Sequence, residues 1–136
     1  TQVVLPRFAG DLAALLHQAA GGALVDDARF ADDAAVTVVC AAQGYPGALR
    51  TGDQIAGLDA ARAVPGVQVF AAGVGAGPDG SLVTAGGRVL DVTAVAPTIA
   101  EASAAAYAAV REISWPGMHT RADIARFGAS NTEETR

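Results

Sequence analysis

The order of the apolar patterns along the 136-residue chain is the feature that most constrains its fold. A helical pattern comes first, several short strand-like runs fill the middle, and a second helical pattern comes near the end. Because strands and helices do not alternate, we do not expect a doubly wound parallel sheet. The order predicts an α+β fold, with a small antiparallel β-sheet and flanking helices.

Two segments have the 3.6-residue period of amphipathic helices. The first, residues 11–22, has Asp11 as a good N-cap and ends at two glycines. The second, residues 97–113, starts at Pro97 or Thr98 and is ended by the Trp-Pro-Gly of residues 115–117. The residues expected on the inward faces are Leu12, Leu15, Leu16 and Ala19 in the first helix, and Ile99, Ala102, Ala106, Val110 and Ile113 in the second.

Short runs of apolar and β-branched residues predict the strands. Residues 34–42 are apolar enough for a strand buried on both faces. Residues 66–73 alternate as a strand does, and residues 75–80 are typical of a turn. Residues 43–61 carry turn signals throughout and predict a long loop, a kind of segment that is often functional.

Two further runs, residues 81–85 and 88–96, flank Gly86 and Gly87. Glycine takes a positive φ at little cost, so this pattern predicts a two-residue turn that joins two antiparallel strands. The four aspartates in residues 26–33 predict a solvated connection with room for one short strand, and the tail after Gly128 is polar.

Composition excludes several classes of function. The net charge of −5 argues against nucleic acid as a main partner. All nine basic residues are arginine, so this chain supplies no Schiff-base lysine and no phosphate-loop lysine. Its uncharged stretches are too short to span a membrane, and the N-terminus does not have the pattern of a signal peptide. The single cysteine, Cys40, fits a cytoplasmic location.

Catalytic and metal-binding motifs are missing from the sequence. It has neither a nucleophile-turn Ser-His-Asp pattern nor a His or Cys cluster with metal spacing. The Gly-x-Gly-x-Gly of residues 73–80 precedes a strand and not a helix, so we interpret it as a turn. We interpret His17 as a surface residue and His119 as structural, and the paired aspartates lack the spacing of a calcium loop.

Two loops have both a structural and a functional interpretation. The "GYPG" sequence of Gly44, Tyr45, Pro46 and Gly47 fits a reverse turn with proline at its second position, and equally a turn whose N–H groups approach a small ligand. In "TAGGR", Arg88 and the glycine N–H groups could hold a phosphate or carboxylate. The alternative is a salt bridge from Arg88 to a carboxylate such as Asp91.

Several stretches, in this order, resemble the C-terminal part of the phosphoribosylamine–glycine ligase family, also called glycinamide ribonucleotide synthetase. The resemblance covers roughly residues 1–125, and the stretches that carry it are "TQVVLP", "GYPG" with "GDQIAGLD", "VFAAG", "LVTAGGRVLDVTA" and "IAEASAAAYAAVREISWPGMHTRADI". The chain departs from the family pattern at Ala71, Val74, Thr120 and Ala122, while Arg121 and Asp123 match it.

The resemblance implies a C-terminal domain of an ATP-grasp ligase, which joins glycine to 5-phosphoribosylamine with ATP and Mg²⁺ (or Mn²⁺) in purine biosynthesis. It implies that residues 1–20 end the ATP-grasp core, residues 21–128 form the C-terminal domain and residues 129–136 are a tail. It also implies that the acidic magnesium-binding stretch precedes Thr1, so the chain should bind neither ATP nor metal alone. The partners it implies are the N-terminal and ATP-binding domains of the same enzyme.

The substrate-binding residues expected from the motifs and the resemblance are Gln2, Gly44, Tyr45, Pro46, Gly47, Thr84, Gly86, Gly87 and Arg88. The resemblance favours a ligand-facing Arg88. We expect no catalytic residue in this chain, which begins without methionine as a fragment would. Two alternatives stay open: a non-catalytic binding or structural module with the same fold, and a split enzyme whose ATP-binding half is another chain.

Overall fold

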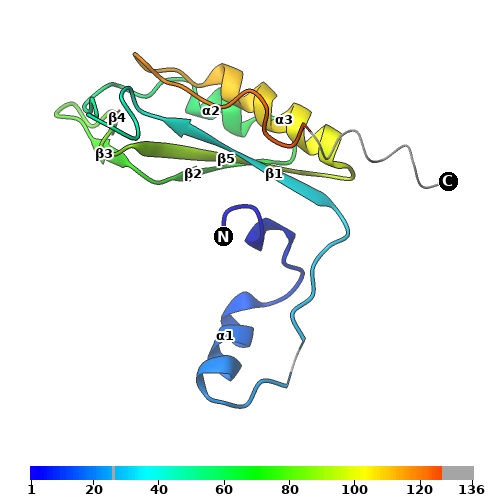
Figure 1. Cartoon of the computed structure of the whole chain (residues 1–136). Coiled ribbons are helices and arrows are strands. Elements are labelled where there is room, and N and C mark those ends of the chain that lie inside the picture. The colour runs from blue at the N-terminus through cyan, green and yellow to red at the C-terminus, as the bar shows by residue number, and fades with distance from the viewer. Residues whose placement is uncertain (26, 127–136) are drawn as a thin grey trace.

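A three-stranded antiparallel sheet organises the computed structural model, which describes residues 1–25 and 27–126 (Figure 1). The central strand β5 (Arg88–Ala96) pairs on one side with β1 (Ala34–Ala41) and on the other with β2 (Val67–Ala71). The strands β3 (Val74–Ala76) and β4 (Leu82–Thr84) form a separate two-stranded sheet. The helices are α1 (Leu12–Ala20), α2 (Leu58–Arg62), α3 (Ile99–Glu112) and a short 3₁₀ turn, η1 (Leu5–Arg7).

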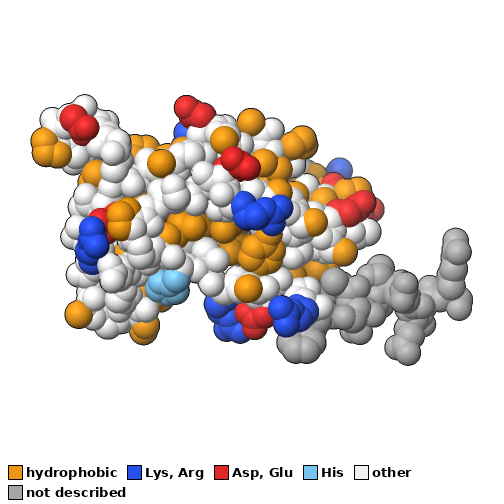
Figure 2. All heavy atoms as spheres, turned by 90° about the horizontal axis from the view of Figure 1, so that it is seen from above, with side chains coloured by type: hydrophobic (Ala, Val, Ile, Leu, Met, Phe, Trp, Pro, Cys, Tyr) orange, Lys and Arg blue, Asp and Glu red, His pale blue; other side chains and the backbone are white. Residues whose placement is uncertain are grey.

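Helices α2 and α3 cover one face of the three-stranded sheet, and the core lies between these two layers (Figure 1). Val38 and Val92 are paired across β1 and β5 and are fully buried under α3. The helix meets them with Ala102, Ala106 and Ala109, whose small side chains allow close approach to the sheet. On the outer side of this layer, charged side chains are scattered among apolar ones (Figure 2).

Helix α3 starts where the sequence predicts. The Thr98 hydroxyl accepts a hydrogen bond from the Glu101 N–H, and the Glu101 carboxylate accepts one from the Thr98 N–H, which is a capping box. Of the expected inward stripe, Ala102, Ala106, Val110 and Ile113 are buried. Ile99, in the first turn, is exposed.

The predicted hairpin at Gly86 and Gly87 is wrong. Strand β4 pairs with β3, so the two flanks of the glycines belong to different sheets and do not pair. The physical reason is that β1 and β2 already occupy both edges of β5, which leaves no edge for β4. Neither glycine adopts a positive φ, so conformational freedom does not explain them.

The prediction that the first strand is buried on both faces is also wrong. In β1, Val36, Val38 and Cys40 are buried against the helices, whereas Thr37 and Val39 on the other face are only half-buried. One helical layer packs on this sheet, so the other face of the edge strand β1 is only partly covered. We call the side away from the helices the open face; it carries Thr37, Val39, Asp91 and Thr93.

Two short elements were missed within predicted loops. Helix α2 overlaps the end of the predicted 43–61 loop, and β3 overlaps the predicted 75–80 turn. Both are too short to leave a periodic signal and are stabilised by tertiary contacts, such as the fully buried Ala61 of α2.

The segment before β1 extends away from the sheet on its open side (Figure 1). Asp11 caps α1 by accepting from the Ala14 N–H at 2.9 Å, as predicted. The apolar face of α1 is nevertheless uncovered, and Leu16 is 58% exposed. Phe8 and Phe30 make an edge-to-face contact and a single β-bridge, and the described part of residues 26–33 contains no strand.

Two other expectations concern membrane spans and the C-terminal tail. No helix among the described residues is long and apolar enough to cross a membrane. The predicted tail, residues 129–136, lies outside the described residues.

Candidate functional site

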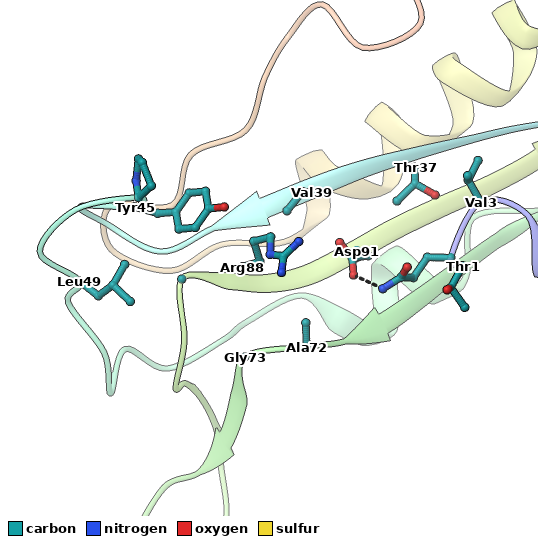
Figure 3. Close-up of a pocket in the computed structure, with 13 residues that line it drawn as sticks. Thr1, Val3, Thr37, Val39, Tyr45, Leu49, Ala72, Gly73, Arg88 and Asp91 are labelled. Carbon is teal, nitrogen blue, oxygen red and sulfur yellow. Dashed lines mark hydrogen bonds between the residues drawn. The ribbon is translucent and has the colours of Figure 1, made fainter.

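A hollow of about 760 Å³ lies on the open face of the sheet (Figure 3). Strand β1 supplies its floor with Thr37 and Val39, which point away from the helices. Its rim comes from three segments far apart in the sequence, namely the N-terminus, the "GYPG" loop and the stretch around Gly87. The hollow is therefore a product of the tertiary fold and not of a single motif.

A β-bulge brings the two charged residues of the hollow onto the same face. Cys40 pairs with Leu90 but the next residue, Ala41, pairs with Arg88, so Val89 is an extra residue in β5. In a regular strand, residues three apart point to opposite faces. The bulge offsets this alternation, and Arg88 and Asp91 both line the hollow (Figure 3).

Arg88 is an exposed cation, and its guanidinium makes no ion pair or hydrogen bond with any residue in the described ranges. In particular, Arg88 and Asp91 do not form the salt bridge that was the structural alternative. The neighbouring N–H groups of Gly86 and Gly87 also have no hydrogen-bond acceptor within the described part of the chain. An unpaired guanidinium beside free N–H groups can bind an anion.

Close packing explains the glycines of the "TAGGR" stretch. A Cβ on Gly87 would lie 2.4 Å from Cδ2 of Tyr45, because the tyrosine ring lies against the glycine backbone. Gly86 faces Gly73, and a Cβ on Gly73 would lie 2.7 Å from the Gly86 Cα. These contacts join the "GYPG" loop, β5 and the end of β2 around the hollow.

The "GYPG" loop is a reverse turn, in which the Gly47 N–H donates to the Gly44 carbonyl at 2.6 Å. Pro46 follows a cis peptide bond and occupies the third position of this turn, whereas the sequence suggested the second. Gly44 has a φ of 87°, and a Cβ there would collide with the Ala48 carbonyl. Tyr45 and Pro46 line the hollow, while Gly44 and Gly47 shape the turn behind them.

The N-terminal residues form the opposite wall. The Gln2 Nε2 donates to Oδ2 of Asp91 at 2.9 Å (Figure 3). The Thr93 hydroxyl donates to the Gln2 carbonyl at 3.0 Å. The hydroxyls of Thr37 and Thr93 lie 2.7 Å apart. Thr1, Gln2 and Val3 all line the hollow.

The structure thus brings together five of the nine candidate residues. Those that line the hollow are Gln2, Tyr45, Pro46, Gly87 and Arg88. Thr84 lies elsewhere: it is 1% exposed, and its hydroxyl accepts from the Asp53 N–H at 3.1 Å. Gly44, Gly47 and Gly86 are next to lining residues but do not line the hollow.

Sequence reasoning missed Thr37, Val39 and Asp91 as lining residues. For Thr37 and Val39, the signal was the alternation within residues 34–42, which places them opposite the buried valines. Asp91 stands out as a carboxylate inside an apolar strand, but only the bulge directs it to the same face as Arg88.

The donor set of the hollow does not fit a nucleotide–metal complex. It contains one guanidinium and one carboxylate, and that carboxylate already accepts a hydrogen bond from Gln2. Metal ions such as Mg²⁺ require oxygen ligands, chiefly carboxylates, and no group of three or more His, Cys, Asp or Glu among the described residues could hold an ion. Cys40 is not a nucleophile either, since burial, with a smaller effect of Asp91, raises the pKa of its thiol to about 12.

Together these features define a small α+β domain whose sheet is covered by helices on one face and carries, on the other, a hollow lined by one arginine and one aspartate. The family model described as "Phosphoribosylglycinamide synthetase, C domain" matches residues 35–127, and the chain belongs to this family. The resemblance stated from the sequence and the predicted α+β class are both confirmed.

Several relatives are similar over almost the whole chain. Phosphoribosylamine–glycine ligase of Streptomyces coelicolor is 50% identical over 133 residues, which cover 95% of this chain and 32% of that protein. The Rhizobium meliloti ligase is 49% identical, covering 90% of this chain and 29% of that protein. A crystal structure of the Thermotoga maritima ligase superposes with a TM-score of 0.68 at 33% identity, covering 82% of this chain and 26% of that one. The chain therefore spans about a third of the length of these two relatives.

Proposed function

We propose that the chain is the C-terminal part of a phosphoribosylamine–glycine ligase, which converts ATP, 5-phosphoribosylamine and glycine to ADP, phosphate and glycinamide ribonucleotide in purine biosynthesis. The observation that carries the proposal is the 50% identity to the Streptomyces coelicolor ligase over 95% of this chain. Residues 1–20 would end the ATP-grasp core and residues 21–128 would form the C-terminal domain. The enzyme would be cytoplasmic, where a single buried thiol stays reduced.

In this proposal the hollow is the contribution of the domain to the substrate side of the active site. Arg88 binds an anionic group, next to Gly87, which also lines the hollow. Both substrates supply such a group, since glycine carries a carboxylate and phosphoribosylamine a phosphate. The free guanidinium and its place in the hollow support this role.

ATP and its metal ion belong to the other domains of the enzyme in this scheme, because the hollow lacks the carboxylates and the lysines that would hold them. ATP supplies the phosphoryl group that activates the glycine carboxylate. The residues of this chain bind and orient substrate and, by covering the site, exclude water. The chain alone would then be inactive, and no glycine-dependent ADP release is expected from the purified 136-residue chain. Such release would contradict the assignment of ATP and its metal ion to the other domains.

A chimera tests the proposal directly. The corresponding third of the Streptomyces coelicolor ligase is replaced by this chain, and glycine-dependent ADP release is measured with phosphoribosylamine present. We expect an active enzyme. A chimera that folds but has no activity would contradict the ligase function and favour a non-catalytic module.

Arg88→Ala in the active chimera tests the site. Loss of a charged hydrogen bond to substrate should lower kcat/KM by about ten- to a hundredfold, equivalent to about 1.5–3 kcal/mol. The matched control is Arg62→Ala, which removes an exposed arginine of α2 that does not line the hollow. Equal kcat/KM for the two variants would refute a substrate contact by Arg88.

A further inference from the structure

We propose that Asp91 is a positioning residue that fixes the side-chain amide of Gln2 so that its carbonyl oxygen accepts a hydrogen bond from substrate in the hollow. The proposal rests on the proposed function, and it assigns a role to a residue that the sequence motifs did not single out. It is carried by the contacts between β5 and the N-terminal residues.

The contact between Asp91 and Gln2 determines which end of the amide is free. Asp91 is 7% exposed, and its Oδ2 accepts from Nε2 of Gln2 at 2.9 Å. An ionised carboxylate can only accept, so the NH₂ group of Gln2 must face Asp91. The Gln2 Oε1 is then left without a hydrogen-bond donor among the described residues, and Gln2 lines the hollow.

A second contact holds the backbone of the same residue. The Thr93 hydroxyl donates its one hydrogen to the Gln2 carbonyl at 3.0 Å, so the Thr37 hydroxyl, 2.7 Å from it, must be the donor in that pair. Gln2 is thus held at both its backbone and its side chain by the central strand. Fixing a flexible glutamine before substrate arrives lowers the entropy cost of binding.

The consequence is a hollow with two chemically different ends. At one end the Arg88 guanidinium offers donors to an anion, and at the other end the Gln2 Oε1 offers an acceptor. A ligand that fits both ends carries an anionic group and an N–H or O–H donor. Glycine and phosphoribosylamine share this chemistry, and separate KM values for the two distinguish between them.

A double-mutant cycle in the chimeric ligase tests whether Asp91 acts through Gln2. Asp91→Leu and Gln2→Ala should each lower kcat/KM about tenfold, and the double variant should be no worse than the poorer single variant. Asp91→Asn keeps an acceptor oxygen and should restore most of the activity. Additive losses, or no rescue by asparagine in a variant that melts like the wild type, would overturn the proposal.

A measurement that needs no activity separates this proposal from the proposed function. In ¹⁵N spectra of the chain, the side-chain NH₂ of Gln2 should exchange slowly with solvent, and at least tenfold faster in Asp91→Leu. Fast exchange in the wild-type chain would overturn the positioning role whatever the kinetics show. Slow exchange together with an inactive chimera would instead overturn the proposed function and, with it, the substrate role of Gln2.

Discussion

Gly73→Ala should destabilise the protein more than Gly87→Ala, although the new methyl group at Gly87 starts closer to its neighbour. At Gly73 the Cβ would meet the Arg88 carbonyl oxygen and the Gly86 Cα, both at 2.7 Å. These are backbone atoms, and Gly73 is itself hydrogen-bonded to the Arg88 carbonyl at 2.8 Å. At Gly87 the Cβ would meet the ring of Tyr45, at 2.4 Å, but that residue is 39% exposed and its side chain can swing outward.

The magnitudes follow from two opposing effects. Alanine restricts the unfolded chain and so stabilises by about 0.4–1 kcal/mol at a position with an ordinary φ. Neither glycine has a positive φ, so no backbone strain enters. Overpacking costs about 1–3 kcal/mol where neighbours cannot move. We expect a net loss of about 1–2 kcal/mol for Gly73→Ala and of less than about 1 kcal/mol for Gly87→Ala.

Urea unfolding of each variant, followed by the fluorescence of the single, buried Trp115, measures the difference. For a domain of this size, 1 kcal/mol corresponds to roughly 4 °C in Tm. Gly87→Ala should additionally displace the Tyr45 ring, which a change in the tyrosine NMR signals would reveal. The reasoning fails if Gly73→Ala is as stable as the wild type, or if Gly87→Ala is the less stable of the two.

Two further predictions concern buried polar groups. Since burial raises the pKa of the Cys40 thiol to about 12, against 9.0 in its unperturbed state, the folded protein keeps a proton that the unfolded chain loses between these values. The free energy of unfolding should therefore fall by about 1.4 kcal/mol per pH unit between pH 9 and 12. The Cys40→Ala variant should lack this contribution to the slope. Equal slopes for the variant and the wild type would contradict the prediction. Thr84→Val should cost about 1–3 kcal/mol in urea unfolding, because it leaves the Asp53 N–H without its acceptor, whereas Thr84→Ser should cost less.

The candidate site could be predicted from the sequence only as separate loops. "GYPG" and "TAGGR" were recognisable as candidate ligand-binding loops, because glycine, proline and arginine in this order are typical of turns that can approach an anion. Four of their residues, Tyr45, Pro46, Gly87 and Arg88, do line the hollow. Thr84 is close to them in sequence but is buried elsewhere. Asp91 could not be predicted, because its direction depends on a bulge that only strand pairing reveals.

The sequence by itself determined the local elements. The helical period of α3 with its Trp-Pro-Gly stop, the N-cap at Asp11 and the β-branched run of β1 predicted α3, α1 and β1, because these signals act between residues a few positions apart. They also sufficed to exclude an alternating α/β fold.

Only the tertiary structure decided how these elements pair. Gly86 and Gly87 join β4 to β5 without a hairpin, because β1 and β2 pair with the two edges of β5 and leave none for β4. The same pairing covers one face of β1 and leaves the other open, with the hollow upon it. Strand pairing and burial are energies between residues distant in sequence, and local patterns do not encode which of several possible partners will occupy an edge.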